Sequence, residues 1–473
     1  MRISDRPPID LTYCLNVHPG ETWEQQFEAI REYTLPIRDR VTASRADRRF
    51  GLGLRLSDLS AQQLLGGKRG LAPFAESKGA CPLFPALDEE AEKKSAKKGT
   101  GTFSRAEKTS QSPFSIEAFK EFLAEEDLYV FTVNGFPFGQ FHQTVVKDRV
   151  YRPDWAQSAR REYTETIARV LVELIDKGAT ASISTAPLTF KGWPEWEQGV
   201  APGLRQLAET AYTLWLLYQE TGRRVVLALE PEPYCYPETM SEMIEVFDIL
   251  RHDVGPAVLE QHGVSRSDAA QILQKHIGVC FDTAHQAVEF EDLTAGLQSL
   301  LDAHVPIAKV QLSAALEVDP TVAPLESLAR FADRTYLHQT NIHHPDGTLD
   351  RYADLPEGKG DWLVFSAREK VPVPFSGPTQ KEASEGAEIG VDKKSSEERA
   401  AEAEKMAEKK GTGTFSAKTS QSPFSLRIHY HWPLYQPTAG PGISSTSHLL
   451  LGDFARLLRT SGCPHWEIET YTW

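Results

Sequence analysis

The sequence has few cysteines and no long apolar run, and both absences limit its class. Its five cysteines are odd in number and lack C-x-x-C spacing, which argues against a disulfide framework or a thiolate zinc site: Cys14, Cys81, Cys235, Cys280 and Cys463. No stretch approaches the ~18–20 consecutive apolar residues of a membrane helix, and the first residues lack an apolar signal core. We therefore expect a cytoplasmic, reduced protein that does not span a membrane.

Basic residues are also under-represented. The 473 residues include 51 Lys and Arg against 66 Asp and Glu, which gives a formal charge of −15. Proteins that bind nucleic acid through its phosphates usually carry a basic face, so this balance argues against a nucleic-acid partner. With 40% hydrophobic and 25% charged residues, the composition is that of a soluble globular protein.

A pair of repeated motifs occurs far apart in the chain. Lys97-Lys-Gly-Thr-Gly-Thr-Phe-Ser104 recurs at 409–416, and Lys-Thr-Ser-Gln-Ser-Pro-Phe-Ser follows at 108–115 and again at 418–425. The spacing between the copies is far outside the period of a repeat architecture. The repeats therefore do not indicate a solenoid.

The genetic code offers an origin for these repeats. The reverse complement of codons for Lys-Lys-Gly-Thr-Gly-Thr-Phe can encode the segment Lys78 to Phe84 and, in another frame with the serine codon included, Glu369 to Phe375. We interpret 77–115 and 366–425 as inserted, translated inverted repeats; the alternative is low-complexity linkers that match by chance. Their Glu/Lys/Ala-rich middles bury too little apolar surface to order, beyond an isolated helix near 395–410.

Outside these segments, short apolar strands alternate with amphipathic helices. This pattern predicts a parallel sheet with helical crossovers, and we expect a (β/α)8 TIM barrel, formed by a single domain over 1–473. Nine candidate strands are present, one more than such a barrel uses: Leu11–Val17, Gly51–Leu56, Leu128–Val133, Ala181–Thr185, Val225–Glu230, Ile277–Asp282, Ile307–Leu312, Leu426–Trp432 and Trp466–Tyr471.

Six helices and one hairpin complete the expected elements. The hairpin covers 336–352, with Pro345-Asp-Gly347 at its turn, and we expect it to lie at the catalytic rim. The predicted helices are Trp23–Val41, Ser158–Lys177, Gly203–Thr221, Thr239–Leu250, Leu293–His304 and Ser447–Arg459.

Polar side chains stand at the C-terminal ends of five strands, where barrel enzymes carry their active sites. Because side chains alternate along a strand, each of these residues shares its strand's inward face. Ordered along the chain, the residues are Glu230, Asp282 with His285 just beyond it, Lys309, Gln311 and Ser313, His429 and His431, and Glu467 and Glu469. Carboxylates that are buried together repel one another unless they share a proton or bind a cation.

A divalent metal is the simplest resolution of this crowding. Oxygen ligands with imidazole suit one ion of Mn²⁺, Mg²⁺, Co²⁺ or Zn²⁺. Taken singly, each residue has a structural alternative: an inward Glu230 can be a hydrogen-bonding group, and His429 can be a satisfied core histidine.

The segment Leu229-Glu-Pro231, the motif Asp282-Thr-Ala-His285 and a late strand ending in Glu469 resemble the xylose isomerase-like barrels, especially the ketose 3-epimerases. The resemblance implies that Glu230, Asp282 and Glu469 bind the metal and that the two glutamates exchange the substrate proton. His285 and Lys309 are further catalytic candidates.

One ligand position departs from that pattern. Where the epimerases have a histidine on strand seven, this chain has Gln311, and a His-x-His pattern follows one strand later at His429 and His431. Either the ligand set is altered or the strand count is shifted by one, so we expect Gln311 or His431 as the fourth metal ligand.

A narrower resemblance covers nearly the whole chain outside the two inserted segments. The segments Leu11 to Trp23, Gly51 to Leu56, Val133 to Gly139, Val150 to Trp155, Ser182 to Pro187 and Glu467 to Trp473 resemble the metabolite-traffic protein family EboE. That family implies a bacterial gene cluster shared with a UbiA-type membrane protein and a TatD-like hydrolase, linked to export of a lipid-like or secondary metabolite. In and around these segments, polar residues are candidates for substrate binding, together with His429: Asn16, His18, Arg55, Asn134 and His142.

Two functions stay open at this point. The first is a metal-dependent sugar isomerase or epimerase-like enzyme that moves a proton next to a carbonyl of a polyol or sugar-like metabolite. The second is a non-catalytic protein that binds or handles such a metabolite. A third, phosphodiesterase chemistry of the endonuclease IV kind with its trinuclear, His-rich site, is disfavoured by the charge of −15.

Overall fold

A computed structural model describes most of the chain outside the two repeat-bearing segments. The described residues are 1–5, 7–45, 49–66, 114–139, 145–320, 322–323, 328, 330–332, 335–355 and 424–470. The predicted insertions lie almost entirely outside this set, as do Cys81 and His142. The four described cysteines are buried and form no disulfide.

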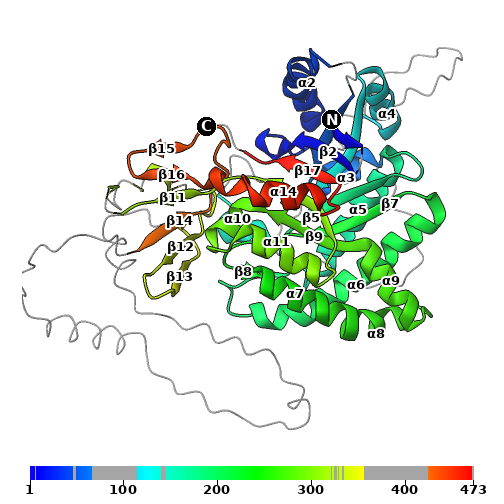
Figure 1. The fold of residues 1–473 in the computed structure, drawn as a ribbon. Helices are drawn as coiled ribbons and strands as arrows, with labels where there is room; N and C mark the ends of the chain where they lie inside the picture. Colours follow the sequence, from blue (N-terminus) through cyan, green and yellow to red (C-terminus); the bar gives the residue numbers. More distant parts are fainter. Residues whose placement is uncertain are drawn as a thin grey trace, which may run out of the picture.

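The centre of the molecule is a nine-stranded sheet that nearly closes into a barrel (Figure 1). Eight strands run parallel, and β1 (Arg2–Asp5) adds an antiparallel edge to the first of them. In spatial order the eight are β2 (Pro8–Tyr13), β17 (His465–Ile468), β10 (Ile307–Leu312), β9 (Ile277–Asp282), β7 (Arg224–Leu229), β5 (Thr180–Thr185), β4 (Leu128–Asn134) and β3 (Phe50–Arg55). A single parallel bridge between Cys14 and Gly53 links the two ends, so the predicted α/β barrel is confirmed in outline.

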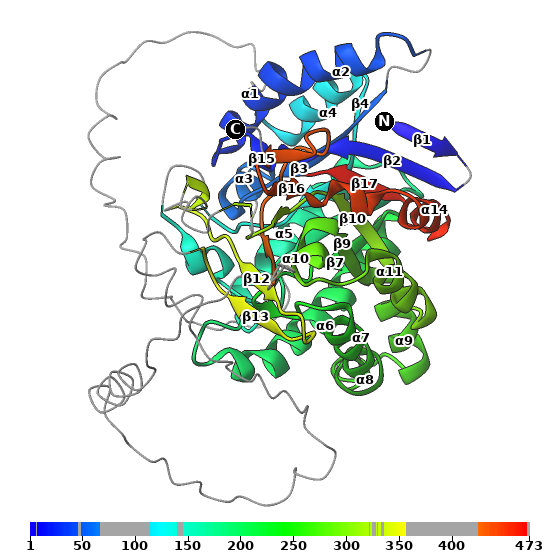
Figure 2. The same cartoon turned by 60° about the vertical axis from the view of Figure 1, so that its left-hand side comes forward.

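Helices form the outer layer around this sheet (Figure 2). Several begin at a side chain that accepts a backbone N–H of the first turn; Thr22, for example, forms a capping box with Gln25. The α-helices are α1 (Trp23–Ala29), α2 (Leu35–Thr42), α3 (Asp58–Leu64), α4 (Ile116–Glu125), α5 (Ser158–Leu174), α6 (Trp196–Thr221), α7 (Met240–Ile249), α8 (Gly255–Glu260), α9 (Arg266–His276), α10 (Thr283–Val288), α11 (Leu293–Asp302) and α14 (Asp453–Thr460). All six predicted helices are present with shifted ends, and single π-helical segments (Ile30–Thr34, Leu250–Val254) extend two of them.

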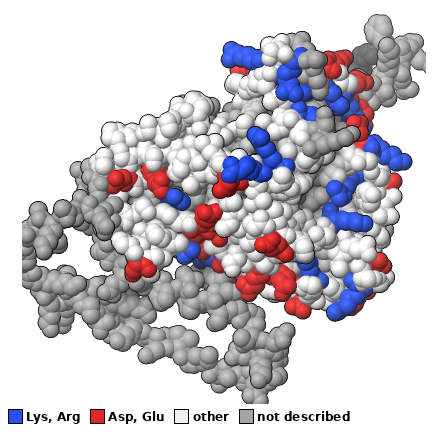
Figure 3. All heavy atoms as spheres, in the orientation of Figure 1, with Lys and Arg blue, Asp and Glu red and all other residues white. Residues whose placement is uncertain are grey.

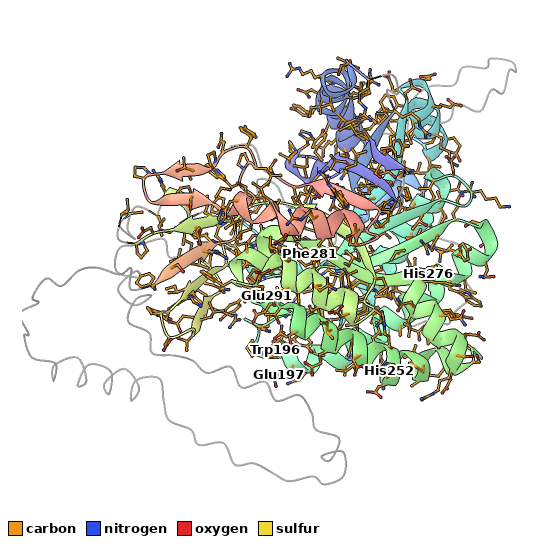
Figure 4. All side chains as sticks on the ribbon, viewed as in Figure 1. Trp196, Glu197, His252, His276, Phe281 and Glu291 are labelled. Atoms are coloured by element: carbon orange, nitrogen blue, oxygen red, sulfur yellow. The ribbon has the colours of Figure 1, made fainter. Side chains whose placement is uncertain are left out.

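The main core lies between the strands and this helical layer. Phe281 of β9, which is labelled in Figure 4, stacks on Phe454 of α14 with ring centroids 5.9 Å apart. The barrel interior is mixed: Val226, Ala228, Cys280 and Ala308 form a small apolar cluster, whereas Thr132 and Ser182 are hydrogen-bonded at 2.8 Å. Space there is tight, because a Cβ on Gly53 would lie 1.7 Å from Oε1 of Glu467. Glycine at this position makes room for a buried carboxylate.

A second, antiparallel sheet of six strands stands at one end of the barrel (Figure 1). Its order is β13 (Leu349–Tyr352), β12 (Thr340–His343), β14 (Ser425–Ile428), β11 (Leu316–Val318), β16 (Ile443–Ser445) and β15 (Thr438–Gly440), and it has its own apolar core. The candidate strand Leu426–Trp432 belongs to this sheet as β14, so it is the one of the nine candidates that lies outside the barrel. The hairpin is confirmed, with Gly347 at φ 84° in its turn.

The small sheet covers the C-terminal ends of the barrel strands. His276, which directly precedes β9, lies at the end of the barrel away from the small sheet (Figure 4). Helix α10, which directly follows β9, lies beside the small sheet (Figure 1). A two-stranded sheet, β6 (Thr189–Phe190) with β8 (Cys235–Tyr236), joins the loops at the same end.

On the face drawn in Figure 3, Lys and Arg side chains stand among Asp and Glu side chains. None of the described helices is long and apolar enough to cross a membrane.

Candidate metal centre

A cavity of about 280 Å³ opens between the C-terminal ends of the barrel strands and the small sheet. The barrel contributes Glu230 after β7, Gln311 on β10 and Glu469 after β17, and the small sheet contributes His429 and His431 after β14. Asp282, at the end of β9, is fully buried beside this group. The five residues predicted to bind metal thus converge at one place: Glu230, Asp282, Gln311, His431 and Glu469.

The two oxygens of Asp282 have different surroundings. Oδ1 accepts from the backbone N–H groups of Ala284 (2.7 Å) and His285 (3.0 Å), which caps α10, and from Oγ of Ser313 (2.6 Å). Oδ2 is buried and makes no hydrogen bond within the described part of the chain. A buried carboxylate oxygen without a donor is costly unless a cation binds it.

The side-chain amide of Gln311 also has one hydrogen-bonded atom and one buried atom without a partner among the described residues. Its Nε2 donates to Glu230, at 3.1 Å from Oε1 and 3.4 Å from Oε2, which leaves its Oε1 buried and without a partner among the described residues. On the other side of the group, Nδ1 of His431 lies 3.7 Å from Oε2 of Glu469. Possible ligand atoms of Asp282, His431 and Glu469 all lie within 4.8 Å of one another, and so do those of Glu230, Asp282 and His285.

Three imidazoles form a second part of the site. His429 Nε2 lies 3.0 Å from His285 Nε2 and 3.1 Å from His431 Nε2. The other ring nitrogens face oxygen atoms: His285 Nδ1 lies 3.0 Å from the Pro231 carbonyl, and His429 Nδ1 lies 2.7 Å from Gln339 Oε1. The structure therefore brings His285 and His429 into the cluster, although we predicted roles for them in catalysis and substrate binding.

Burial and neighbouring charge shift the pKa values of this group. Burial raises the pKa of Glu230 to about 8, despite the opposing charge of His285. Burial alone would raise the pKa of Asp282, but the imidazoles of His285 and His431 lower it below its usual range. Burial would lower the pKa of His285, but Asp282 and Glu232 raise it to about 9. Without a cation, the cluster thus retains protons near neutral pH.

Lys309 lies one layer below the cavity, which differs from the predicted catalytic placement. Its Nζ lies 2.5 Å from Glu467 Oε2, and both side chains are fully buried. Nζ also donates to Asn134 Oδ1 (2.7 Å) and Ser184 Oγ (3.0 Å), and these two residues line the cavity floor. The charge of Lys309 is thus paired with Glu467 inside the barrel, where the ammonium group supports Asn134 and Ser184.

The predicted substrate-binding residues divide into two groups. Asn16 and Asn134 line the cavity. His18 does not line it, because it stacks on Tyr33 at 4.4 Å and lies 3.0 Å from the Tyr13 hydroxyl. Arg55 forms an ion pair with Glu21 at 2.9 Å outside the cavity lining. His142 lies outside the described residues.

Sequence reasoning missed several cavity residues. Tyr151 donates to Glu232 at 2.5 Å, and Gln339 Nε2 donates to both, at 2.7 and 3.2 Å. The Glu-Pro-Glu spacing that follows β7 was a usable signal for Glu232, whereas nothing local marks Gln339. The wall around Tyr151 is apolar: Phe136, Val150 and Leu337 pack in one cluster with Tyr151, and Pro137 and Val146 also line the cavity.

The comparisons with known proteins give little for this chain. No protein family model matches it, and no curated protein matches it. One similar solved structure is the crystal structure of an AP endonuclease, family 2, from Brucella melitensis, at 10% identity and a TM-score of 0.27. The match covers 41% of this chain and 63% of that chain, which is less than two thirds of it. At this score the similarity carries no argument, and the barrel assignment rests on the strand pairing described above.

Proposed function

We propose that this protein is a divalent-metal-dependent enzyme of the xylose isomerase-like, sugar isomerase or epimerase kind, acting by proton transfer at a carbon next to a carbonyl. The observation that carries the proposal is the placement of Glu230 and Glu469. They follow β7 and β17, which stand three places apart in the sheet, and both face one cavity. Two carboxylates on different sides of a substrate provide a base and an acid for one carbon.

The residues present fit a divalent cation. Asp282 Oδ2 and Gln311 Oε1 are buried acceptors without a donor among the described residues, and Glu230 and Glu469 supply further oxygens. His431 is the remaining candidate ligand. A mainly oxygen donor set suits Mn²⁺ or Mg²⁺, and one with imidazole suits Co²⁺ or Zn²⁺. When bound, the cation polarises the carbonyl and hydroxyl oxygens of the substrate.

The protein's own groups then do the remaining work. One glutamate, Glu230, takes a proton from the carbon, and Glu469 returns one to it. Gln311 Nε2 holds the Glu230 carboxylate in a single orientation through its two contacts. The small sheet covers the cavity and limits the access of water to the reacting atoms.

The cavity favours a small substrate with two unlike ends. Its volume of about 280 Å³ is near the lower limit for small-molecule sites, which begin at about 300 Å³. Asn16, Asn134 and Ser184 present polar groups suited to a sugar-like or polyol end, while Phe136 and Val150 present an apolar surface. This apolar wall also favours the second candidate function, a non-catalytic metabolite-handling protein of the EboE family. A functional link to a UbiA-type membrane protein and a TatD-like hydrolase belongs to that proposal.

Deuterium exchange tests the enzyme proposal. Wild-type protein incubated with candidate sugars and polyols in deuterated water should place deuterium at a carbon next to a carbonyl. Glu230→Gln and Glu469→Gln keep the side-chain volume but remove the exchangeable proton, so exchange should fall by ~10² or more while binding persists. A bound metabolite that carries no deuterium and binds equally well to Glu230→Gln would instead establish metabolite handling.

A further inference from the structure

We propose that His285, His429 and His431 form a second cation site, separate from the carboxylate site, that binds a borderline ion such as Zn²⁺ through three Nε2 atoms. The proposal goes beyond the proposed function, because it concerns a second ion and does not depend on turnover.

The hydrogen-bond partners determine where the ring protons are. The carbonyl of Pro231 can only accept, so Nδ1 of His285 carries its hydrogen. Gln339 Nε2 donates to the carboxylate of Glu232, so its Oε1 faces His429, and Nδ1 of His429 carries a hydrogen as well. In the neutral rings, both Nε2 atoms then present lone pairs to each other across 3.0 Å. Two lone pairs at this distance repel unless something positive lies between them.

A single proton does not satisfy the whole group. The Nε2 lone pair of His429 has two imidazole neighbours, at 3.0 and 3.1 Å, and one lone pair accepts one strong hydrogen bond. A proton on one neighbouring ring therefore leaves the other ring's Nε2 facing His429 without a proton between them. A cation bound by all three nitrogens satisfies every Nε2 lone pair at once.

The spacing of the nitrogens fits one ion. Zinc binds imidazole nitrogen at about 2.0–2.1 Å, so two ligands at the tetrahedral angle are about 3.3–3.4 Å apart. The observed separations are 3.0 and 3.1 Å, so the rings need to move apart by only a few tenths of an ångström to bind one ion. The second ring nitrogen of each of two histidines is hydrogen-bonded, as is usual for metal-binding histidines. Nδ1 of His285 donates to the Pro231 carbonyl, and Nδ1 of His429 donates to Gln339 Oε1. Only 4% of His285 and 9% of His431 is exposed.

The two sites are distinct because His431 faces them with different atoms. Its Nε2 belongs to the imidazole group, whereas its Nδ1 points toward Glu469. If Nε2 binds the second ion, Nδ1 is left to donate toward Glu469. The carboxylate site then uses Glu230, Asp282, Glu469 and the Oε1 of Gln311. The result is one nitrogen site and one oxygen site, which differ in the ions they prefer.

Metal titration of the purified full-length protein tests the proposal. Zn²⁺ in competition with a chelating dye, followed by elemental analysis and X-ray absorption, should show one Zn²⁺ bound by imidazoles, and Mn²⁺ should bind in addition. His429→Phe should weaken the Zn²⁺ site at least ~100-fold and leave Mn²⁺ binding intact, whereas Asp282→Asn should do the reverse. The matched control is His276→Phe, because His276 is a buried histidine at the far end of the barrel, where its Nδ1 lies 2.9 Å from the Val225 carbonyl, away from the imidazole group.

Two outcomes would overturn the proposal. A single ion lost equally in His429→Phe and Asp282→Asn would mean one shared site, and unchanged Zn²⁺ binding in His429→Phe would mean that the imidazoles hold protons only. If His429→Phe does not fold, Gln339→Met removes the acceptor for His429 Nδ1 and should weaken Zn²⁺ ~10–100-fold. Deuterium exchange reports on the proposed function separately, so either idea can fail alone.

Discussion

Lys309 Nζ lies 2.5 Å from Glu467 Oε2 inside the barrel, and neither side chain is exposed to solvent. The two residues come from neighbouring strands, β10 and β17, and Asn134 Nδ2 donates to the same carboxylate at 3.1 and 3.2 Å. Burial would lower the pKa of Lys309, but Glu467 raises it above its usual range, so the lysine stays charged. This ion pair supports the floor of the cavity.

Breaking that pair should be costly. Lys309→Met leaves the Glu467 charge buried without its partner and should lower the free energy of unfolding by about 3–5 kcal/mol. The double variant Lys309→Met, Glu467→Gln should recover much of the loss, because no charge is left buried. Urea denaturation measures both. The exposed pair of Lys120 and Glu173 is the control: Lys120→Met should cost less than ~1 kcal/mol. A loss that small in Lys309→Met would contradict the prediction.

Asp282 has separable structural and ligand roles. Asp282→Asn retains an Oδ1 that can accept from Ala284 and His285 and replaces the Oδ2 that has no donor, so the carboxylate-site metal should be lost with little change in stability. Asp282→Ala should also lose the helix cap, at about 0.5–2 kcal/mol. Elemental analysis and thermal melting of the two variants check this. Equal metal content in wild type and Asp282→Asn would remove Asp282 from the ligand set.

Stability should fall as pH rises through the titration of Glu291, labelled in Figure 4. Burial raises the pKa of Glu291 to about 7, although its carboxylate accepts from the backbone N–H of Met240. In the unfolded chain the pKa is about 4.3, so the folded state holds the extra proton between the two values. The contribution is complete below about pH 4.3 and is lost as pH rises through about 7.

Removing this carboxyl isolates its effect. Between pH 5 and pH 8 the wild type should lose about 1–3 kcal/mol more unfolding free energy than Glu291→Gln, as measured by urea denaturation. Glu197→Gln, at an exposed position on α6, should follow the wild type. Parallel pH profiles for wild type and Glu291→Gln would show that Glu291 does not titrate in this range.

The two repeat-bearing segments should be dispensable for folding and metal binding. The structure indicates that each deletion should end two residues earlier than the repeats do. Ser115 caps α4 by accepting from Ala118 N–H at 3.1 Å, and Ser425 pairs with His343 in the small sheet. Deleting 77–113 and 366–423 therefore keeps both serines and should preserve cooperative unfolding and metal content. The longer deletion of 77–115 and 366–425 should be less stable by about 1 kcal/mol or more from the lost cap. A shorter-deletion variant without a cooperative transition would show that the segments belong to the fold.

Local pattern was enough to predict the barrel strands and several of their polar ends. Alternation along a single strand places Glu230, Asp282 and Gln311 at one end of the sheet, because parallel strands share their direction and a barrel points alternate residues inward. The cap of the short helix α10 was not predicted, because an Asp at a strand end is equally typical of a metal ligand and of a helix cap. In the structure Oδ1 of Asp282 caps the helix, and Oδ2 is left available to a cation.

The sequence by itself determined nine strands, of which eight form the barrel, together with the helical crossovers and the carboxylates at the strand ends, because each depends on periodicity over a few residues. Only the tertiary structure decided that the strand before His429 pairs in the small sheet and that Lys309 forms a buried ion pair with Glu467. It also decided that the Nε2 atoms of three histidines lie together. Those outcomes depend on pairing between segments that lie more than a hundred residues apart, such as Leu316 with Ile428, and on side-chain partners such as Gln339 for His429. Strand alternation alone carries no information about such partners.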